Sequence, residues 1–286
     1  MMLVASCAAL LGSIAVAAQQ KSVELSHVDA RLKGGCPVAN FAFTFQVGED
    51  GVPGYLWRNT GRLGGWLEAA GRMEIKIAHD GKEYTIDEFE NREVTRRFPF
   101  AGVVAQPKGI KSQLTLETFA PLGVNDEHTS SLPALMMEFV LKNPTSRSEE
   151  FSIIITPCFD GEEWASDGDN ALKGTTLYLG CNTSAQWDGK RLSIPVKATK
   201  SAEQKGRLLL TYDKEWISTR SFASAEELYN YGMRNWDILR ERTQQFAAAI
   251  PHTSDDELNA YLRWYMTAGI SLTRLTADGK ALTLGY

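Results

Sequence analysis

Short runs of alternating hydrophobic and polar residues make up most of the chain between about residues 23 and 221. Gly, Asp, Asn and Pro separate these runs roughly every ten residues, which is the spacing of antiparallel strands. Residues 41–47 place apolar side chains on one face, and residues 73–77 alternate up to Asp80-Gly81, which predicts a tight hairpin with a return strand at 84–86. Further strands are expected at residues 114–119, 134–142, 151–157, 175–179, 192–196 and 206–212. The pattern predicts a mainly β protein built on a large antiparallel β-sandwich.

The hydrophobic period lengthens from two residues to about 3.6 towards the C-terminal end. Ser224 and Glu227 stand at the spacing of a capping box, which predicts a helix from there to about Ala249. Residues 254–257 repeat this spacing and predict a second helix that ends near Leu275. We therefore expect two α-helices after the sandwich.

The first 18 residues are uncharged, and the small residues that follow their apolar run fit the cleavage site of a secretory signal peptide. We expect residues 1–18 to be removed on export to the periplasm or the extracellular space, residues 19–221 to form the sandwich, and residues 222–286 to form a helical segment. Lipoprotein anchoring at Cys7 is a less favoured alternative. The apolar run is shorter than the roughly 20 residues that a bilayer requires, so no membrane span is predicted.

Composition and charge narrow the possible partners. The 286 residues include 30 Lys and Arg against 35 Asp and Glu, a net charge of -5 without a long basic run, so nucleic-acid binding is not expected. The histidines are scattered singly, and neither C-x-x-C nor H-E-x-x-H occurs, so the sequence predicts no metal site and no cofactor. Cys158 and Cys181 either form a disulfide or remain free thiols.

Acidic residues stand beside tryptophan at residues 160–164. Carboxylates bind sugar hydroxyls and an indole covers the apolar side of a pyranose ring, so these residues are a candidate sugar site. The stronger alternative is a solvated loop in which Trp164 lies over the edge of the sandwich. A Ca²⁺-binding loop is a weaker alternative. Tryptophans near glycines at positions 57 and 66 either stack on a sugar, contact a further domain or close the end of the sandwich. A carboxylate beside an imidazole at residues 125–128 suits acid–base chemistry or a polar loop. The candidate substrate-binding residues are Trp57, Trp66, Asp160, Glu162, Glu163 and Trp164.

Two stretches in the middle of the chain carry a resemblance to a known family. Residues 119–134 contain F-x-P-L, then an aspartate, then S-S-L-P, and residues 138–145 form a predicted strand that ends in N-P-T. Both resemble the N-terminal domain of six-hairpin glycoside hydrolases, in particular glycoside hydrolase family 116, the glucosylceramidase and β-glucosidase group. Residues 263–266 and 282–286 resemble the point at which such chains enter their (α/α)6 barrel.

The resemblance implies a two-sheet supersandwich followed by the truncated start of a barrel. In these families both catalytic carboxylates lie in the barrel, so the resemblance assigns no catalytic residue to this sequence. Glycoside hydrolysis requires two facing carboxyl groups, roughly 5 to 9 Å apart. The implied function is that of the non-catalytic N-terminal portion of an exported glycoside hydrolase. Its partners would be carbohydrate and the missing C-terminal barrel, whose sugar cleft it would help to shape.

Two alternatives remain open at the level of sequence. A complete secreted β-sandwich protein that binds carbohydrate would pack its two helices on the sandwich or use them to form a dimer. A self-sufficient hydrolase or lyase on the sandwich would depend on residues 160–164.

Overall fold

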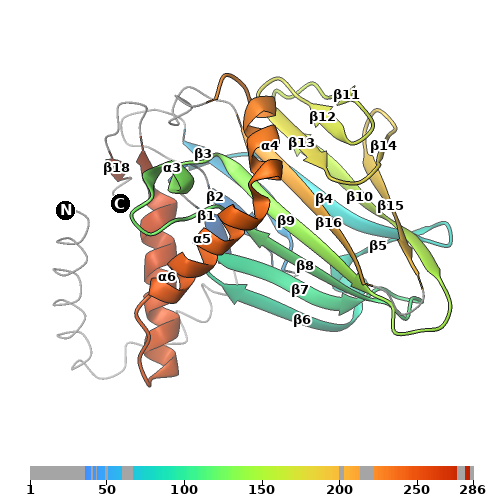
Figure 1. The fold of residues 1–286 in the computed structure, drawn as a ribbon, viewed down its shortest axis with the longest axis horizontal. Helices are drawn as coiled ribbons and strands as arrows, with labels where there is room; N and C mark the ends of the chain where they lie inside the picture. Colours follow the sequence, from blue (N-terminus) through green and yellow to red (C-terminus); the bar gives the residue numbers. More distant parts are fainter. Residues whose placement is uncertain are drawn as a thin grey trace. The chain divides into compact units, whose positions relative to one another are not determined.

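The computed structural model describes residues 36–39, 41–42, 44–48, 51–59, 67–199, 203–212, 222–275 and 281–283. All of them belong to one compact unit, Gly35–Tyr286. This unit is mainly β, with two large antiparallel sheets and helices towards its C-terminal end (Figure 1). The predicted signal peptide and Cys7 lie outside the described residues.

The first sheet has eight strands, and its pairings are antiparallel. Its hydrogen-bonded order is β1 (Cys36–Ala39), β2 (Thr44–Val47), β3 (Pro53–Asn59), β4 (Leu67–His79), β10 (Glu149–Phe159), β15 (Leu192–Ala198) and β14 (Gln186–Trp187), with β5 (Lys82–Thr85) paired to β4.

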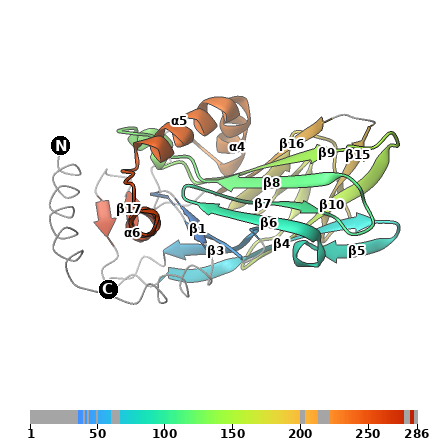
Figure 2. The same ribbon diagram turned by 90° about the horizontal axis from the view of Figure 1, so that it is seen from below.

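The second sheet also has eight antiparallel strands. Its order is β11 (Ala165–Asp167), β12 (Ala171–Lys173), β13 (Leu177–Cys181), β16 (Glu203–Tyr212), β9 (Ala134–Lys142), β8 (Gln113–Phe119), β7 (Phe100–Gln106) and β6 (Glu90–Arg97). Figure 2 shows the two sheets as stacked layers, which confirms the predicted sandwich.

The hairpin between β4 and β5 forms as its Asp-Gly pair predicts. His79 pairs with Lys82, and the two residues between them have positive φ angles of 49° at Asp80 and 72° at Gly81, as a type I′ turn requires. The return strand β5 begins two residues before the expected start and ends one residue before the expected end, at Thr85, whose N–H donates to the Glu88 carboxylate at 2.7 Å at the start of the 3-10 helix η1 (Ile86–Glu88).

Strands β6 and β7 have no clear alternating pattern, and the sequence does not predict them. β6 is an edge strand rich in charged residues, which protects the open edge of the second sheet from pairing with another chain. β7 is buried on three consecutive positions, Ala101, Gly102 and Val103, so its sequence lacks the two-residue period of a half-exposed strand.

The main hydrophobic core lies between the sheets. One buried cluster joins both of them and includes Phe45, Ile77 and Ile155 of the first sheet and Leu116, Phe139 and Leu208 of the second. Phe139 also lies over its cross-strand partner Gly206, where an added Cβ would collide with the ring.

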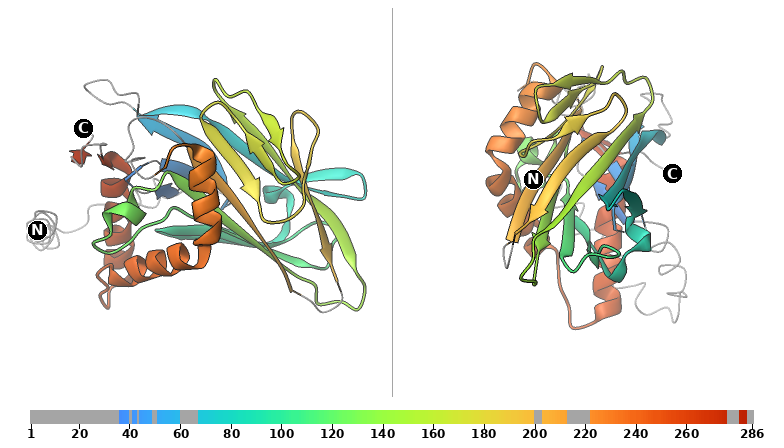
Figure 3. Two further views of the ribbon diagram at one scale, coloured as in Figure 1. Left: turned by 45° about the horizontal axis from the view of Figure 1, so that its top comes forward. Right: turned by 90° about the vertical axis from the view of Figure 1, so that its right-hand side faces the viewer.

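Helices α4 (Ala225–Arg234) and α5 (Trp236–Ala249) cover the outer face of the second sheet (Figures 1 and 3). Ser224 caps α4 as predicted, its hydroxyl accepting the Glu227 N–H at 3.1 Å. The single helix expected up to Ala249 is instead broken at Asn235, whose side-chain amide donates to the Tyr231 carbonyl at 2.9 Å. The break lets Trp236, which is completely buried, enter the layer between the helices and the sheet.

Helix α6 (Asp256–Leu272) packs on the end of the sandwich beside β1. Its N-cap is Asp255 rather than the expected Ser254, because the Asp255 carboxylate accepts the N–H groups of Glu257 and Leu258 at 2.9 and 3.0 Å. The helix ends before Leu275, where β17 (Thr273–Leu275) pairs with β18 (Ala281–Thr283). No described helix is long and apolar enough to cross a membrane.

The two cysteines whose pairing the sequence leaves open lie in different sheets and are free thiols. Cys158 is exposed on β10, whereas Cys181 is buried on β13. Burial raises the pKa of the Cys181 thiol above its ordinary value, so this group remains protonated and unreactive at neutral pH.

Two glycine substitutions should change stability in opposite directions. Gly206→Ala should lower the free energy of unfolding by about 1–3 kcal/mol, because the new methyl group displaces the Phe139 ring from a filled core. Gly269→Ala, on the exposed side of α6 with nothing within 4 Å of the new Cβ, should raise it by about 1 kcal/mol through helix propensity. Urea unfolding followed by tryptophan fluorescence measures both values, and a shift of the same sign in both variants would contradict the packing described for the two glycines.

Candidate functional site

The acidic loop at residues 160–164 connects β10 to β11. Asp160 and Glu163 are exposed there, but the Glu162 side chain turns towards the protein. Its carboxylate accepts the N–H groups of Thr176 at 2.9 Å and Leu177 at 3.2 Å, and the Thr176 hydroxyl. An added Cβ at Gly174 would collide with this carboxylate. Glu162 therefore joins its loop to the start of β13, and its oxygens are occupied by backbone donors.

Trp164 is partly buried and covers the edge of the sandwich. Its ring lies 6.2 Å from that of Phe159, centroid to centroid, and it packs against the main core. This is the placement expected from the alternative in which Trp164 lies over the edge of the sandwich. The indole Nε1 is buried without a hydrogen-bond partner, so the indole N–H does not reach solvent.

The calcium alternative has no support in the described residues. Asp167 accepts a hydrogen bond from the Tyr178 hydroxyl at 2.9 Å, while Glu162 binds the start of β13. Among the residues that the structure describes, no group of three or more His, Cys, Asp or Glu side chains could hold a metal ion. Trp57 lies in β3, but its side chain is outside the described part of the chain, as is the whole of Trp66.

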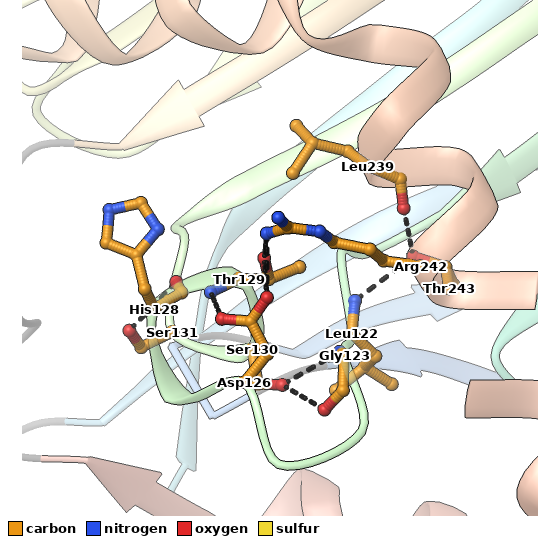
Figure 4. A network of polar contacts seen from close by, with 10 residues as sticks. All are labelled: Leu122, Gly123, Asp126, His128, Thr129, Ser130, Ser131, Leu239, Arg242 and Thr243. Atoms are coloured by element: carbon orange, nitrogen blue, oxygen red, sulfur yellow. Dashed lines mark hydrogen bonds and ion pairs between the residues drawn. The ribbon is translucent and has the colours of Figure 1, made fainter. Parts of the chain in front are cut away.

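A second polar cluster occupies the loop at residues 120–133, between β8 and β9. Asp126 caps the short helix α3 (Glu127–Ser130), its carboxylate accepting the Thr129 N–H at 2.9 Å and hydroxyl at 2.7 Å. Arg242 of α5 reaches the same place and donates to Asp126 Oδ2 at 2.7 Å and to Thr129 Oγ1 at 2.8 Å (Figure 4). The three side chains form a closed triangle that ties the loop to the helix.

The same loop is tied to its surroundings at other points. The Leu122 N–H donates to the Thr243 hydroxyl at 3.1 Å, and this hydroxyl donates to the Leu239 carbonyl at 2.8 Å. The Ser130 carbonyl accepts the Phe41 N–H at 2.9 Å, which connects the loop to the segment between β1 and β2. Loop, helix α5 and first sheet are thus held in one network.

The electrostatics of this cluster favour an ionised carboxylate. Burial on its own raises the pKa of Asp126, but the hydrogen bonds from Thr129 and the positive charge of Arg242 together hold that pKa below its ordinary value. His128 does not join Asp126: its ring contacts Phe222 and Tyr231, with centroids 6.1 and 5.9 Å away, and points away from the carboxylate (Figure 4). Asp126 and His128 therefore have different contact partners: the carboxylate binds Thr129 and Arg242, and the imidazole packs against two aromatic rings.

Helix α6 presents aromatic side chains on the side opposite to the sandwich. Leu262 and Ile270 are buried, whereas Tyr265 is 38% exposed and contacts Tyr261 at a centroid distance of 6.3 Å. Val124, in the loop at residues 120–133, is 50% exposed. The sequence marks α6 as rich in aromatic residues, but which of them face away from the sandwich depends on how the helix packs.

Replacing Glu162 tests whether its carboxylate is structural. Glu162→Gln should lower the free energy of unfolding by about 1–3 kcal/mol, because an amide nitrogen would face the N–H donors of Thr176 and Leu177. The neighbouring Glu163→Gln, an exposed control, should change it by no more than about 0.5 kcal/mol. Equal changes in the free energy of urea unfolding in the two variants would show that the hydrogen bonds accepted by the Glu162 carboxylate do not contribute to stability.

Asp126 should make stability depend on pH in a defined direction. Its folded-state pKa is lowered, so its contribution is present above the unfolded value of about 3.9 and is lost as the pH falls through the folded one. The difference in free energy of unfolding between the wild type and Asp126→Asn should therefore shrink between about pH 6 and about pH 3. Urea unfolding of both proteins over this range checks it, and a difference that stays constant from about pH 6 to about pH 3 would contradict the lowered pKa of Asp126.

Two solved structures with a similar fold are longer than this chain. A structure described as a kojibiose phosphorylase from the human microbiome aligns with a TM-score of 0.52 and 11% identity, covering 86% of this chain and 40% of the other. A bacterial glucoamylase complexed with acarbose aligns with a TM-score of 0.50 and 10% identity, covering 84% and 40%. At such identities the likeness concerns the fold alone. This chain spans about 40% of the length of either structure.

Comparison with protein families is more specific than comparison of folds. Comparison with curated protein sequences gives no match. The family described as beta-glucosidase 2, glycosyl-hydrolase family 116 N-term, matches residues 66–268, which is most of the chain and includes both stretches that carry the resemblance. The chain therefore belongs to the N-terminal domain family of glycosyl-hydrolase family 116.

Proposed function

We propose that this chain is the non-catalytic N-terminal portion of an exported glycoside hydrolase, and that it packs against an (α/α)6 catalytic barrel and helps to shape its sugar cleft. The match to a family 116 N-terminal domain over residues 66–268 is the observation that carries the proposal. In this assignment residues 19–221 supply the sandwich and residues 222–286 begin the helical domain. Export rests on the signal-like sequence of residues 1–18.

The geometry of the acidic residues supports a non-catalytic role. A glycosidase requires two carboxyl groups that face each other across the scissile bond. Glu162 is occupied by backbone donors and Asp126 by Thr129 and Arg242. Neither carboxylate is available to act as an acid or a nucleophile, and both belong to contacts that hold loops in place.

The exposed side of α6 supports the proposed partner. Tyr261 and Tyr265 form an aromatic pair on a helix whose opposite side is already packed on the sandwich. A tyrosine suits an interface that is partly apolar, because its ring is buried while its hydroxyl keeps a polar partner. The apolar sides of barrel helices would cover this pair.

Carbohydrate contact is proposed for the exposed acids and the tryptophans. Asp160 and Glu163 retain free carboxylates at the end of the sandwich where β10 meets β11, and Trp164 lies next to them. With Trp57 and Trp66, they would line the sugar cleft only together with the barrel. The isolated chain should therefore bind free sugars weakly.

The test is to express residues 19–286 and to assay the product against a panel of aryl glycosides. No turnover is expected, because the family resemblance assigns both catalytic carboxylates to the barrel, and because the Glu162 and Asp126 carboxylates are already hydrogen-bonded within this chain. Turnover that is lost in Glu163→Ala, or in Glu162→Ala once that variant is shown to be folded, would overturn the proposal and place the chemistry on the sandwich. Tight binding of a simple glucoside without turnover would favour a self-sufficient carbohydrate-binding protein instead.

A further inference from the structure

Helix α6 is attached to the rest of the protein by contacts near its start and towards its C-terminal end. A small apolar cluster joins Ile270 of the helix to Leu122, Phe98 and Ala39. At the start of the helix, Asn259 accepts the Thr253 N–H at 2.7 Å and donates to the Thr253 carbonyl at 2.9 Å, which fixes the connection from α5. The part of α6 nearest its C-terminal end therefore packs in a cluster to which the loop at 120–133 contributes Leu122.

Leu122 is held in place by α5. Its backbone N–H binds the buried hydroxyl of Thr243, and the loop that carries it is bound by the side chain of the preceding residue, Arg242. Arg242 touches neither α6 nor Leu122 in any of the described contacts. Its influence on α6 passes through Asp126 and Thr129 and then through the loop.

We propose that Arg242 is a positioning residue: by binding Asp126 and Thr129 it keeps Leu122 packed against α6, and so sets the orientation in which α6 presents Tyr261 and Tyr265. The consequence of this for catalysis rests on the proposed function. The placement of α6 itself does not, because it concerns only contacts within this chain.

Helix α5, which carries Arg242, also contains a matched control. Arg240, two residues earlier, forms an equivalent ion pair with Glu117 of β8 at 2.6 Å, and its side chain is about as exposed, 32% against 43% for Arg242. Arg240 ties α5 to a strand of the sheet, whereas Arg242 ties it to the loop. Removing either guanidinium should weaken α5 to a similar degree, but only the loss of Arg242 should release Leu122 and α6.

The experiment measures amide hydrogen exchange of the 286-residue chain by mass spectrometry. Arg242→Met should speed exchange in α6 about tenfold relative to β9 and β10, whereas Arg240→Met should leave α6 within about twofold of the wild type. Arg242→Lys, which keeps a cationic donor, should restore part of the protection. Thr243→Val should also speed exchange in α6, because it removes the hydroxyl that accepts the Leu122 N–H and so loosens Leu122 directly.

Unchanged exchange of α6 in Arg242→Met, or an equal increase in Arg240→Met, would overturn the inference. Because the readout needs neither sugar nor barrel, this failure is separate from failure of the proposed function, which the glycoside assay detects. In a protein that includes the catalytic barrel, Arg242→Met should lower kcat/KM more than Arg240→Met does at equal global stability.

Discussion

The need to bury the second sheet on both of its faces governs the rest of the structure. Its inner face meets the first sheet, but Phe119, Met136 and Leu209 point outward and are nevertheless completely buried. Helices α4 and α5 cover them, and Trp236 contacts Phe119 edge to face at 5.9 Å. Without these helices the protein would expose a large apolar patch, so the sandwich and the helices form one cooperative unit.

Apolar packing alone does not set the direction of a helix on a sheet, and polar contacts supply that direction here. Arg240 binds Glu117 of β8, and Arg207 lies over the Trp236 ring at 5.2 Å. The loop at residues 120–133 then ties α5 to the first sheet and to α6. The sequence motif that carries the family resemblance is this loop. Several of its polar atoms have a structural partner, including those of Asp126, Thr129 and Ser130.

The acidic residues show why composition is a poor guide to catalysis in this protein. Glu162 and Glu149 accept backbone N–H groups from a neighbouring segment, and Asp126 accepts the Thr129 N–H of its own loop; Glu149 binds the N–H groups of Lys111 and Ser112, both at 2.8 Å. Although partial burial of each carboxylate acts in the opposite direction, hydrogen bonds hold the pKa of Glu149 and that of Asp126 below their ordinary values. An acid beside an aromatic residue looks the same in sequence whether it binds a sugar or a neighbouring loop.

The sequence by itself determined the elements that depend on local contacts. Alternation predicted strands such as β4, β9 and β10, Asp80-Gly81 predicted the hairpin, and Ser224 predicted the start of α4, because each signal acts within a few residues of chain. Only the tertiary structure decided where the long helix breaks and which carboxylates accept hydrogen bonds from the protein itself. Trp236 turns into a layer made by distant strands, and Asp126 meets Arg242 across 116 residues. Partners so far apart in the chain leave no periodic pattern, so folding alone brings them together.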